Sequence, residues 1–160
     1  MASLGNSNLV NINTGIFKQD AFIVLVKTEW NADIVDELER GCLKILQQNN
    51  ARVETIVVPG SVEIPFAINK HWAKAKKKMD EPHAYIALGC VIRGETPHFD
   101  YVCRMVADGI LHLNLHLPVP TIFGVLTVNT VEQALDRLGG KHGHKGEEAA
   151  ITAYKMIEVE

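Results

Sequence analysis

The sequence predicts an α/β fold, a three-layer sandwich in which a four-stranded parallel sheet is covered by helices on both faces. Short runs rich in β-branched and aromatic residues alternate with longer amphipathic stretches, as in repeated strand-helix-strand units. The first of these runs, residues 21–28, is mostly apolar, which is typical of a parallel strand buried on both faces. The 160 residues suffice for one core, so we expect a single domain over residues 1–160. Residues 1–20 are expected to form an N-terminal arm that can add a strand to the sheet.

The first half of the chain contains two strand-helix units. Residues 21–28 (AFIVLVKT) predict a strand, and Asn31 is well suited to cap the helix that follows. The same alternation continues with a strand at residues 52–58 and a helix from about Glu63. The apolar residues of the first helix recur at i, i+4, i+8 and i+11 and form one stripe: Ile34, Leu38, Cys42 and Ile45.

The second half repeats this alternation with a longer helix. Residues 84–92 (AYIALGCVI) predict the most apolar strand, and residues 119–126 predict a fourth. Residues 130–138 open with the capping-box pattern Thr-x-x-Gln and predict a short helix. Residues 139–145 (GGKHGHK) predict a flexible break before a last helix that starts at Gly146. The stripe of the long helix between the third and fourth strands is Val102, Val106, Ile110, Leu113 and Leu117.

Composition argues against several classes of function. The chain has 16 Lys and Arg against 19 Asp and Glu, and this net charge of −3 does not favour nucleic-acid binding. Its longest apolar runs fall well short of the roughly 20 residues that span a bilayer. The N-terminal residues lack the pattern of a secretory signal, and Cys42, Cys90 and Cys103 form no C-x-x-C pair. We therefore expect reduced thiols and a cytoplasmic location.

The residues that core packing does not explain follow three of the predicted strands. They lie in residues 29–31 (EWN), 60–63 (GSVE) and 93–98 (RGETPH). In a parallel α/β sheet, ligands bind beyond the carboxyl ends of the strands. The sequence therefore predicts a binding site where these three segments meet.

Trp30 and Glu63 each have two interpretations that spacing alone leaves open. Trp30 is either a wedge that packs the loop or a platform on which a planar heterocycle stacks. Glu63 either complements the positive end of a helix dipole or accepts hydrogen bonds from sugar or polyol hydroxyls. In the second case Gly60 would let the backbone approach the ligand closely.

The third segment combines a possible anion site with a histidine. Residues 94–98 (GETPH) turn into a helix, whose free N–H groups can bind phosphate; the other interpretation is an ordinary capped turn. Most single histidines are structural or solvated. His98 is a candidate for proton transfer because the candidate anion site is adjacent to it.

The other histidine and basic residues that could belong to a site also have ordinary structural explanations. His142 and His144 lack a third metal ligand in a recognisable pattern, so we expect solvent-exposed side chains and no metal site. Arg137 is expected to stabilise the carboxyl end of its helix, and Lys145 is explicable as a loop charge.

Residues from about 21 to 157 resemble the 6,7-dimethyl-8-ribityllumazine synthase family of riboflavin biosynthesis. The segments that carry the resemblance occur in the order and spacing of that family, and together they are highly specific. They are Trp30-Asn31, VPGSVEIP (58–65), LGCVIRGETPHFDYV (88–102), PTIFGVLT (120–127), EQALDR (132–137) and HKGEEAA (144–150).

The resemblance implies a flavodoxin-like fold and a transferase. It implies that 5-amino-6-(D-ribitylamino)uracil condenses with 3,4-dihydroxy-2-butanone 4-phosphate, with loss of phosphate and water and with no cofactor or metal. It also implies homopentamers with active sites shared between subunits, and possible partnership with a riboflavin synthase. The short link at residues 139–146 resembles members that form 60-subunit icosahedral shells.

The resemblance also implies roles for individual residues. His98 matches the proton-transfer histidine, and Trp30 matches the ring that stacks on the pyrimidinedione, usually Phe in this family. Pro97 stands where many members have a hydroxyl residue. The residues implied to bind substrate are Trp30, Asn31, Ser61, Val62, Glu63, Cys90, Val91, Ile92, Glu95, Thr96, Phe123, Arg137 and Lys145.

Within that set the implied contacts differ. Ser61 to Glu63 would hold the ribityl chain, Cys90 to Ile92 the heterocycle, and Glu95 and Thr96 the phosphate. Phe123 would come from the adjacent subunit, and Arg137 with Lys145 would meet the phosphate. Two alternatives stand beside this assignment: a non-catalytic flavin-binding or shell-forming relative, and a different flavodoxin-like enzyme that handles phosphates.

Overall fold

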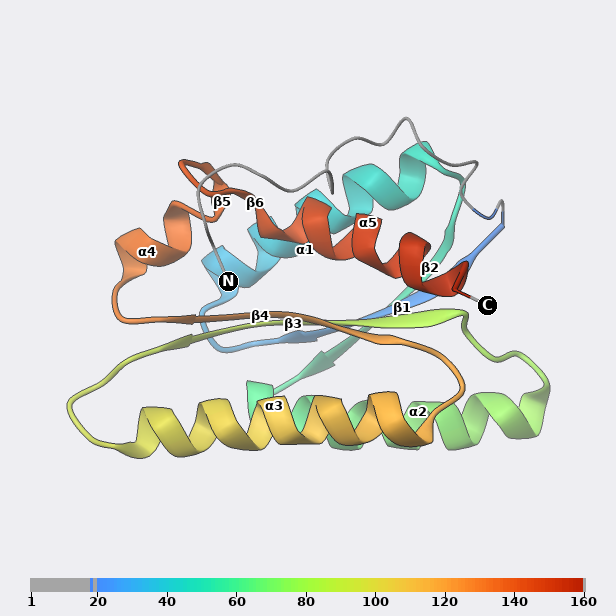
Figure 1. The fold of residues 1–160 in the computed structure, drawn as a ribbon, viewed down its shortest axis with the longest axis horizontal. Helices are drawn as coiled ribbons and strands as arrows, with labels where there is room; N and C mark the ends of the chain where they lie inside the picture. Colours follow the sequence, from blue (N-terminus) through green and yellow to red (C-terminus); the bar gives the residue numbers. More distant parts are fainter. Residues whose placement is uncertain (1–17, 19, 160) are drawn as a thin grey trace.

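The structure, a computed structural model, describes residues 18 and 20–159 and confirms the predicted α/β/α sandwich. In Figure 1 the sheet runs across the middle of the molecule, with helices above and below it. The predicted N-terminal arm and its additional strand fall almost entirely outside the described residues.

The four strands of the central sheet are parallel and lie in the order β2-β1-β3-β4. After β2 the chain crosses back over β1 and pairs with its other side, so the topological switch point lies between β1 and β3. The carboxyl ends of the strands, at the left of Figure 1, are therefore where a ligand site is expected. The strands are β1 (Phe22–Thr28), β2 (Arg52–Val58), β3 (Ala84–Ile92) and β4 (Thr121–Val128).

Two helices cover each face of the sheet. Ile23 and Leu25 belong to the hydrophobic cluster under α1 and α5, whereas Val24 and Val26 belong to the cluster under α2 and α3. Successive side chains of a strand point to opposite faces and both faces are covered, so β1 is apolar from Phe22 to Val26. No helix in the described part of the chain is long and apolar enough to cross a membrane. The helices are α1 (Ala32–Gln48), α2 (Ile64–Lys78, preceded by the 3₁₀ turn η3, Ser61–Glu63), α3 (His98–His116) and α5 (Lys145–Ile157).

The fourth strand begins at Thr121, two residues later than predicted. Pro118 and Pro120 flank Val119, and a proline has no N–H to donate to a neighbouring strand. Pro120 contributes only its carbonyl oxygen, which accepts from the backbone N–H of Tyr85 at 2.9 Å. The ladder of β4 therefore starts after the second proline.

The flexible break predicted at residues 139–145 is wrong, because the segment forms an antiparallel hairpin. β5 (Leu138–Gly140) pairs with β6 (Gly143–His144), and the short helix α4 (Val131–Leu135) ends earlier than predicted. Gly139 and Gly143 have φ angles of 101° and 72°, in the left-handed region that favours glycine. The glycines therefore let the chain reverse its direction in a defined hairpin.

The two predicted helix caps have different outcomes. Thr130 caps α4 as predicted, since its Oγ1 accepts from the N–H of Gln133 at 3.3 Å. Asn31 occupies the predicted cap position of α1, but its side chain makes no capping hydrogen bond. The side chain of Asn31 instead hydrogen-bonds to the backbone of β3.

Candidate active site

Asn31 links the two strands that border the switch point. From the end of β1, its Nδ2 donates to the carbonyl oxygen of Cys90, near the end of β3, at 2.8 Å. Its backbone is left-handed, with φ 57° and ψ 44°, a conformation that asparagine tolerates better than most residues. Asn31 therefore holds the loop after β1 against β3.

Trp30 and Glu63 lie on either side of Gly60. A Cβ atom on Gly60 would lie 3.0 Å from Glu63 Oε2 and 3.8 Å from Trp30 Cδ1. Trp30 is 72 % exposed, which favours the stacking platform over a wedge that packs the loop. The ring lines a small pocket of about 280 Å³ together with Glu29, Asn31 and Pro59.

The other predicted strand-end positions are mostly packed into the sheet. Ser61 is buried, Val62 and Val91 pack against one core cluster, and Ile92 packs against the other. Burial raises the pKa of the Cys90 thiol to about 11, so this thiol stays protonated at neutral pH. These positions can offer a ligand shape and backbone groups rather than a reactive side chain.

The turn between β3 and α3 leaves Glu95, Thr96 and His98 exposed. The hydroxyl of Thr96 accepts from the backbone N–H of His98 at 3.4 Å, and the cap position of α3, Pro97, has no side-chain capping hydrogen bond. His98 is the first residue of α3, so its exposed imidazole lies beside the helix N-terminus. The geometry is compatible with both interpretations of this turn.

Arg93 anchors the same turn, although the sequence pattern did not single it out. Its guanidinium lies 2.8 Å from Asp100 Oδ1, donates to Asn129 Oδ1 at 3.0 Å, and lies over the ring of Phe99. The hydrogen bond with Asp100 raises the pKa of Arg93 and lowers that of Asp100, so both groups stay charged. In the sequence, Arg93 and Asp100 carry opposite charges on either side of the turn that contains Gly94, and this pattern could have indicated their ion pair.

Phe123, Arg137 and Lys145 lie together elsewhere on the molecule. They line an open groove of about 930 Å³ along β4, which is an edge strand of the sheet that the described residues form. Arg137 Nη1 donates to the carbonyl oxygen of Gln133 at 2.6 Å, which confirms its predicted role at the end of α4. Lys145 Nζ donates to both carboxylate oxygens of Glu148, at 2.8 and 2.7 Å. The groove therefore presents an exposed ring, two cations and the carboxylate of Glu148, which pairs with Lys145.

The predicted site residues thus form two groups on one chain. Within the described residues, the loops at 29–31, 59–63 and 93–98 contribute nothing to the lining of the groove along β4. The first group carries an exposed indole, a carboxylate and an imidazole, and the second carries an exposed ring, two cations and the Glu148 carboxylate. A ligand that contacts both groups of residues therefore cannot be bound by the β4 groove of one chain alone.

His144 does not fit its prediction as a solvent-exposed histidine. Its side chain is only 12 % exposed, and its ring accepts from the N–H of Glu147 at the start of α5. His142 is half-buried. In the part of the chain that the structure describes, no three or more His, Cys, Asp or Glu residues are grouped to hold a metal ion.

The strand order β2-β1-β3-β4, with helices on both faces, defines a flavodoxin-like α/β protein. The loops that carry the predicted site residues follow the carboxyl ends of β1, β2 and β3, where enzymes of this class bind their ligands. The family model for 6,7-dimethyl-8-ribityllumazine synthase matches residues 20–160. The chain belongs to the 6,7-dimethyl-8-ribityllumazine synthase family.

Curated relatives agree with the family match. The chain is 47 % identical to a 6,7-dimethyl-8-ribityllumazine synthase of Parabacteroides distasonis over 138 residues, which cover 84 % of this chain and 83 % of the relative. It is 47 % identical to the enzyme of that name from Bacteroides fragilis over 137 residues, 84 % of this chain and 92 % of the relative. A relative of the same name from Christiangramia forsetii is 40 % identical over 163 residues, 99 % of this chain and 95 % of the relative.

Replacing Trp30 separates its two interpretations experimentally. We expect Trp30→Ala to weaken binding of 6,7-dimethyl-8-ribityllumazine about tenfold, because the stacking surface is lost. Since the indole is exposed, the free energy of unfolding should change by less than about 0.5 kcal/mol. Fluorescence titration and urea unfolding measure the two quantities, and Trp30→Phe, which keeps a ring, should bind nearly as well as the wild type. Unchanged binding by Trp30→Ala would exclude the platform.

Proposed function

We propose that the chain condenses 5-amino-6-(D-ribitylamino)uracil with 3,4-dihydroxy-2-butanone 4-phosphate to give 6,7-dimethyl-8-ribityllumazine, with release of phosphate and water. It is a transferase of riboflavin biosynthesis by its family. The observation that carries the proposal is the position of an exposed indole, a carboxylate and an exposed imidazole in the loops that follow β1, β2 and β3, in a chain of this family. No feature of the described residues favours a non-catalytic relative.

The pyrimidine substrate is proposed to bind at the ends of β1, β2 and β3. Stacking on Trp30 would bury one face of its planar ring, and the edge of the ring would meet backbone groups at Cys90 to Ile92. The ribityl hydroxyls would donate to the carboxylate of Glu63, with Ser61 and Val62 beside them. The bond from Asn31 to Cys90 supports this arrangement, because it fixes the platform loop relative to β3.

The phosphate-bearing substrate is proposed to bind between two chains. Glu95 and Thr96, at the N-terminus of α3, would lie beside the phosphate, where free backbone N–H groups and the helix dipole favour an anion. Arg137 and Lys145 of a neighbouring chain would stabilise the leaving phosphate by charge-assisted hydrogen bonds. Phe123 of that neighbour would cover the site.

The reaction then needs orientation and proton transfer rather than a reactive cofactor. An amine nitrogen of the pyrimidine attacks the ketone carbon, and a first water leaves as the C=N bond forms. Elimination of phosphate leaves an enol that tautomerises to a second carbonyl group. The second nitrogen attacks this carbonyl carbon and closes the ring with loss of a second water. Holding both substrates in register can supply on the order of 7 to 11 kcal/mol, judging from well-aligned model systems. His98 would take and return the protons that these steps move, and no metal or cofactor is required.

A site shared between chains requires an oligomer, which we propose to be built from homopentamers. The groove along the edge strand β4 is open, and α3 exposes several large apolar side chains, a pattern typical of a subunit interface. The exposed apolar residues of α3 are Tyr101, Met105, Leu111 and Leu115. The short β5-β6 hairpin supports the 60-subunit icosahedral form. The three free cysteines fit a cytoplasmic location, where a riboflavin synthase would be the partner that takes the product.

Removing the proposed proton shuttle should reduce turnover without abolishing binding. His98→Ala is expected to lower kcat about 10² to 10⁴-fold, the usual contribution of a general acid-base group. The absorbance of the lumazine product follows the reaction. His116→Ala, an exposed histidine at the far end of α3, serves as the control and should keep wild-type turnover. Unchanged kcat in His98→Ala would remove the imidazole from the mechanism.

The assembly can be measured by analytical ultracentrifugation. The proposed shell predicts a particle of about 1 MDa, since each chain has a mass of 17.7 kDa and sixty are required. A particle of about 90 kDa would contradict the shell but retain the pentamer. A monomer of 17.7 kDa would contradict both the shell and the shared site.

A further inference from the structure

The β5-β6 hairpin brings Arg137 and Lys145 together at its base. Arg137 immediately precedes β5, and Lys145 immediately follows β6. The backbone N–H of Lys145 donates to the carbonyl oxygen of Arg137 at 2.9 Å, and Leu138 pairs with His144 in the first step of the hairpin. The positions of the two cations are therefore coupled to each other and to whatever fixes the hairpin.

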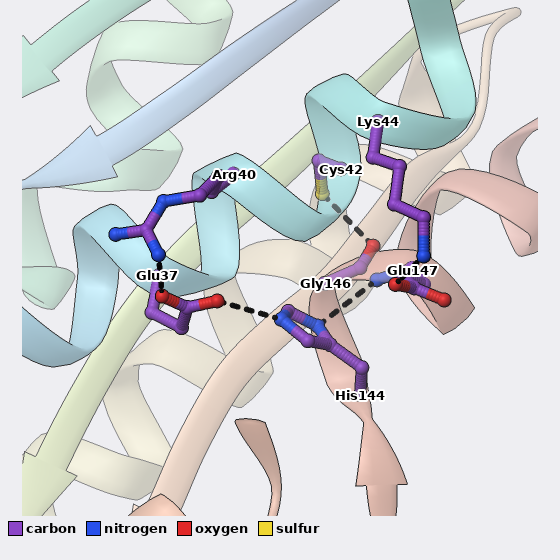
Figure 2. A network of polar contacts seen from close by, with 7 residues as sticks. All are labelled: Glu37, Arg40, Cys42, Lys44, His144, Gly146 and Glu147. Atoms are coloured by element: carbon purple, nitrogen blue, oxygen red, sulfur yellow. Dashed lines mark hydrogen bonds and ion pairs between the residues drawn. The ribbon is translucent and has the colours of Figure 1, made fainter. Parts of the chain in front are cut away.

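His144, at the end of that hairpin, connects it to two helices (Figure 2). Its Nε2 lies 3.3 Å from Glu37 Oε1 on α1, and its Nδ1 accepts from the N–H of Glu147, in the first turn of α5, at 3.4 Å. An imidazole that accepts at Nδ1 carries its proton at Nε2, where it can donate to the carboxylate of Glu37. Both ring nitrogens thus have a partner, and each partner lies on a different helix.

The packing around the imidazole leaves it little freedom. A Cβ atom on Gly41 of α1 would lie 2.1 Å from Cε1 of His144, so only a glycine leaves room for the ring. Beside it, the Cys42 thiol donates to the carbonyl oxygen of Gly146 at 3.0 Å. Burial raises the pKa of that thiol, which keeps its proton available for the bond. The close contact between α1 and the start of α5 therefore holds the ring of His144 in one place.

We propose that His144 is a positioning residue for phosphate binding, which sets Arg137 and Lys145 by fixing the base of their hairpin to α1. This inference rests on the proposed function, in which those two cations bind the phosphate-bearing substrate. His144 itself is absent from the described lining of the β4 groove, whereas Arg137 and Lys145 both line it. Its effect on the phosphate is therefore indirect, through the backbone of the hairpin.

The test measures KM for each substrate separately in four variants. His144→Ala removes both ring contacts, and His144→Asn keeps a good helix cap but not the reach to Glu37. Gly41→Ala leaves His144 chemically intact and displaces its ring. Lys44→Ala is the matched control, because Lys44 pairs with Glu147 at 2.8 Å and so joins α1 to α5 at the surface without touching His144.

We expect His144→Ala and Gly41→Ala to raise KM for the butanone phosphate about tenfold, with KM for the pyrimidine within about twofold of wild type. His144→Asn should raise the first KM by a smaller factor, and Lys44→Ala should change neither. If His144→Ala does not fold, His144→Asn and Gly41→Ala provide the same comparison.

Two results would overturn the inference. One is an unchanged KM for the butanone phosphate in the folded His144 and Gly41 variants. The other is an equal rise in both KM values, which would indicate a general structural defect. A wild-type protein that forms no lumazine would instead contradict the proposed function, so the two failures are distinguishable.

Discussion

The parallel pairing of β1 with β3 is the constraint on which the rest of the structure depends. Because the two strands run in the same direction, the loops that follow them open at the same edge of the sheet. One loop carries Trp30 and the other leads to His98, and the bond from Asn31 to Cys90 fixes the first against β3. Side chains nearly seventy positions apart in the sequence thereby share one edge.

The same sheet also explains why one chain carries two groups of candidate residues. Among the described residues only one side of β4 is paired, and an open groove with Phe123, Arg137 and Lys145 runs along it. An edge strand with such a groove is suited to a neighbouring subunit. The close approach of α1 and α5 requires glycines at positions 41 and 146. This contact holds the start of α5, where Lys145 lies, against α1. The packing of α1 on α5 within one chain therefore also positions residues that line the groove proposed to meet a neighbouring subunit.

Much of this fold follows from patterns that can be read locally. The strand at residues 84–92 is apolar throughout, and its predicted bounds agree with those of β3. The start of β4 was misplaced because prolines, rather than hydrophobicity, determine where its ladder begins. The strand-end location of Trp30 and His98 follows from the rule for parallel sheets, so the segments of the candidate site were predictable without coordinates.

Other features depend on contacts that no local pattern contains. Asn31 is a residue type that commonly caps helices, but its side-chain amide donates a hydrogen bond to Cys90 on β3, 59 residues away. The glycine-rich run at 139–145 has the composition of a flexible loop, yet His144 finds a partner on α1, 107 residues away. In both cases the local sequence predicts one role for the residue, and a long-range hydrogen bond gives it a different role.

The central claim is that His98 of one chain and the cations of another form one site, and subunit complementation tests it most directly. His98→Ala and Arg137→Ala chains are co-expressed, and lumazine formation by the mixed assembly is compared with that of each variant alone. A site shared between neighbours in a ring predicts recovery to about one quarter of the wild-type rate, because about one interface in four then combines an intact histidine with an intact arginine. Activity no higher than that of the separate variants would contradict the shared site.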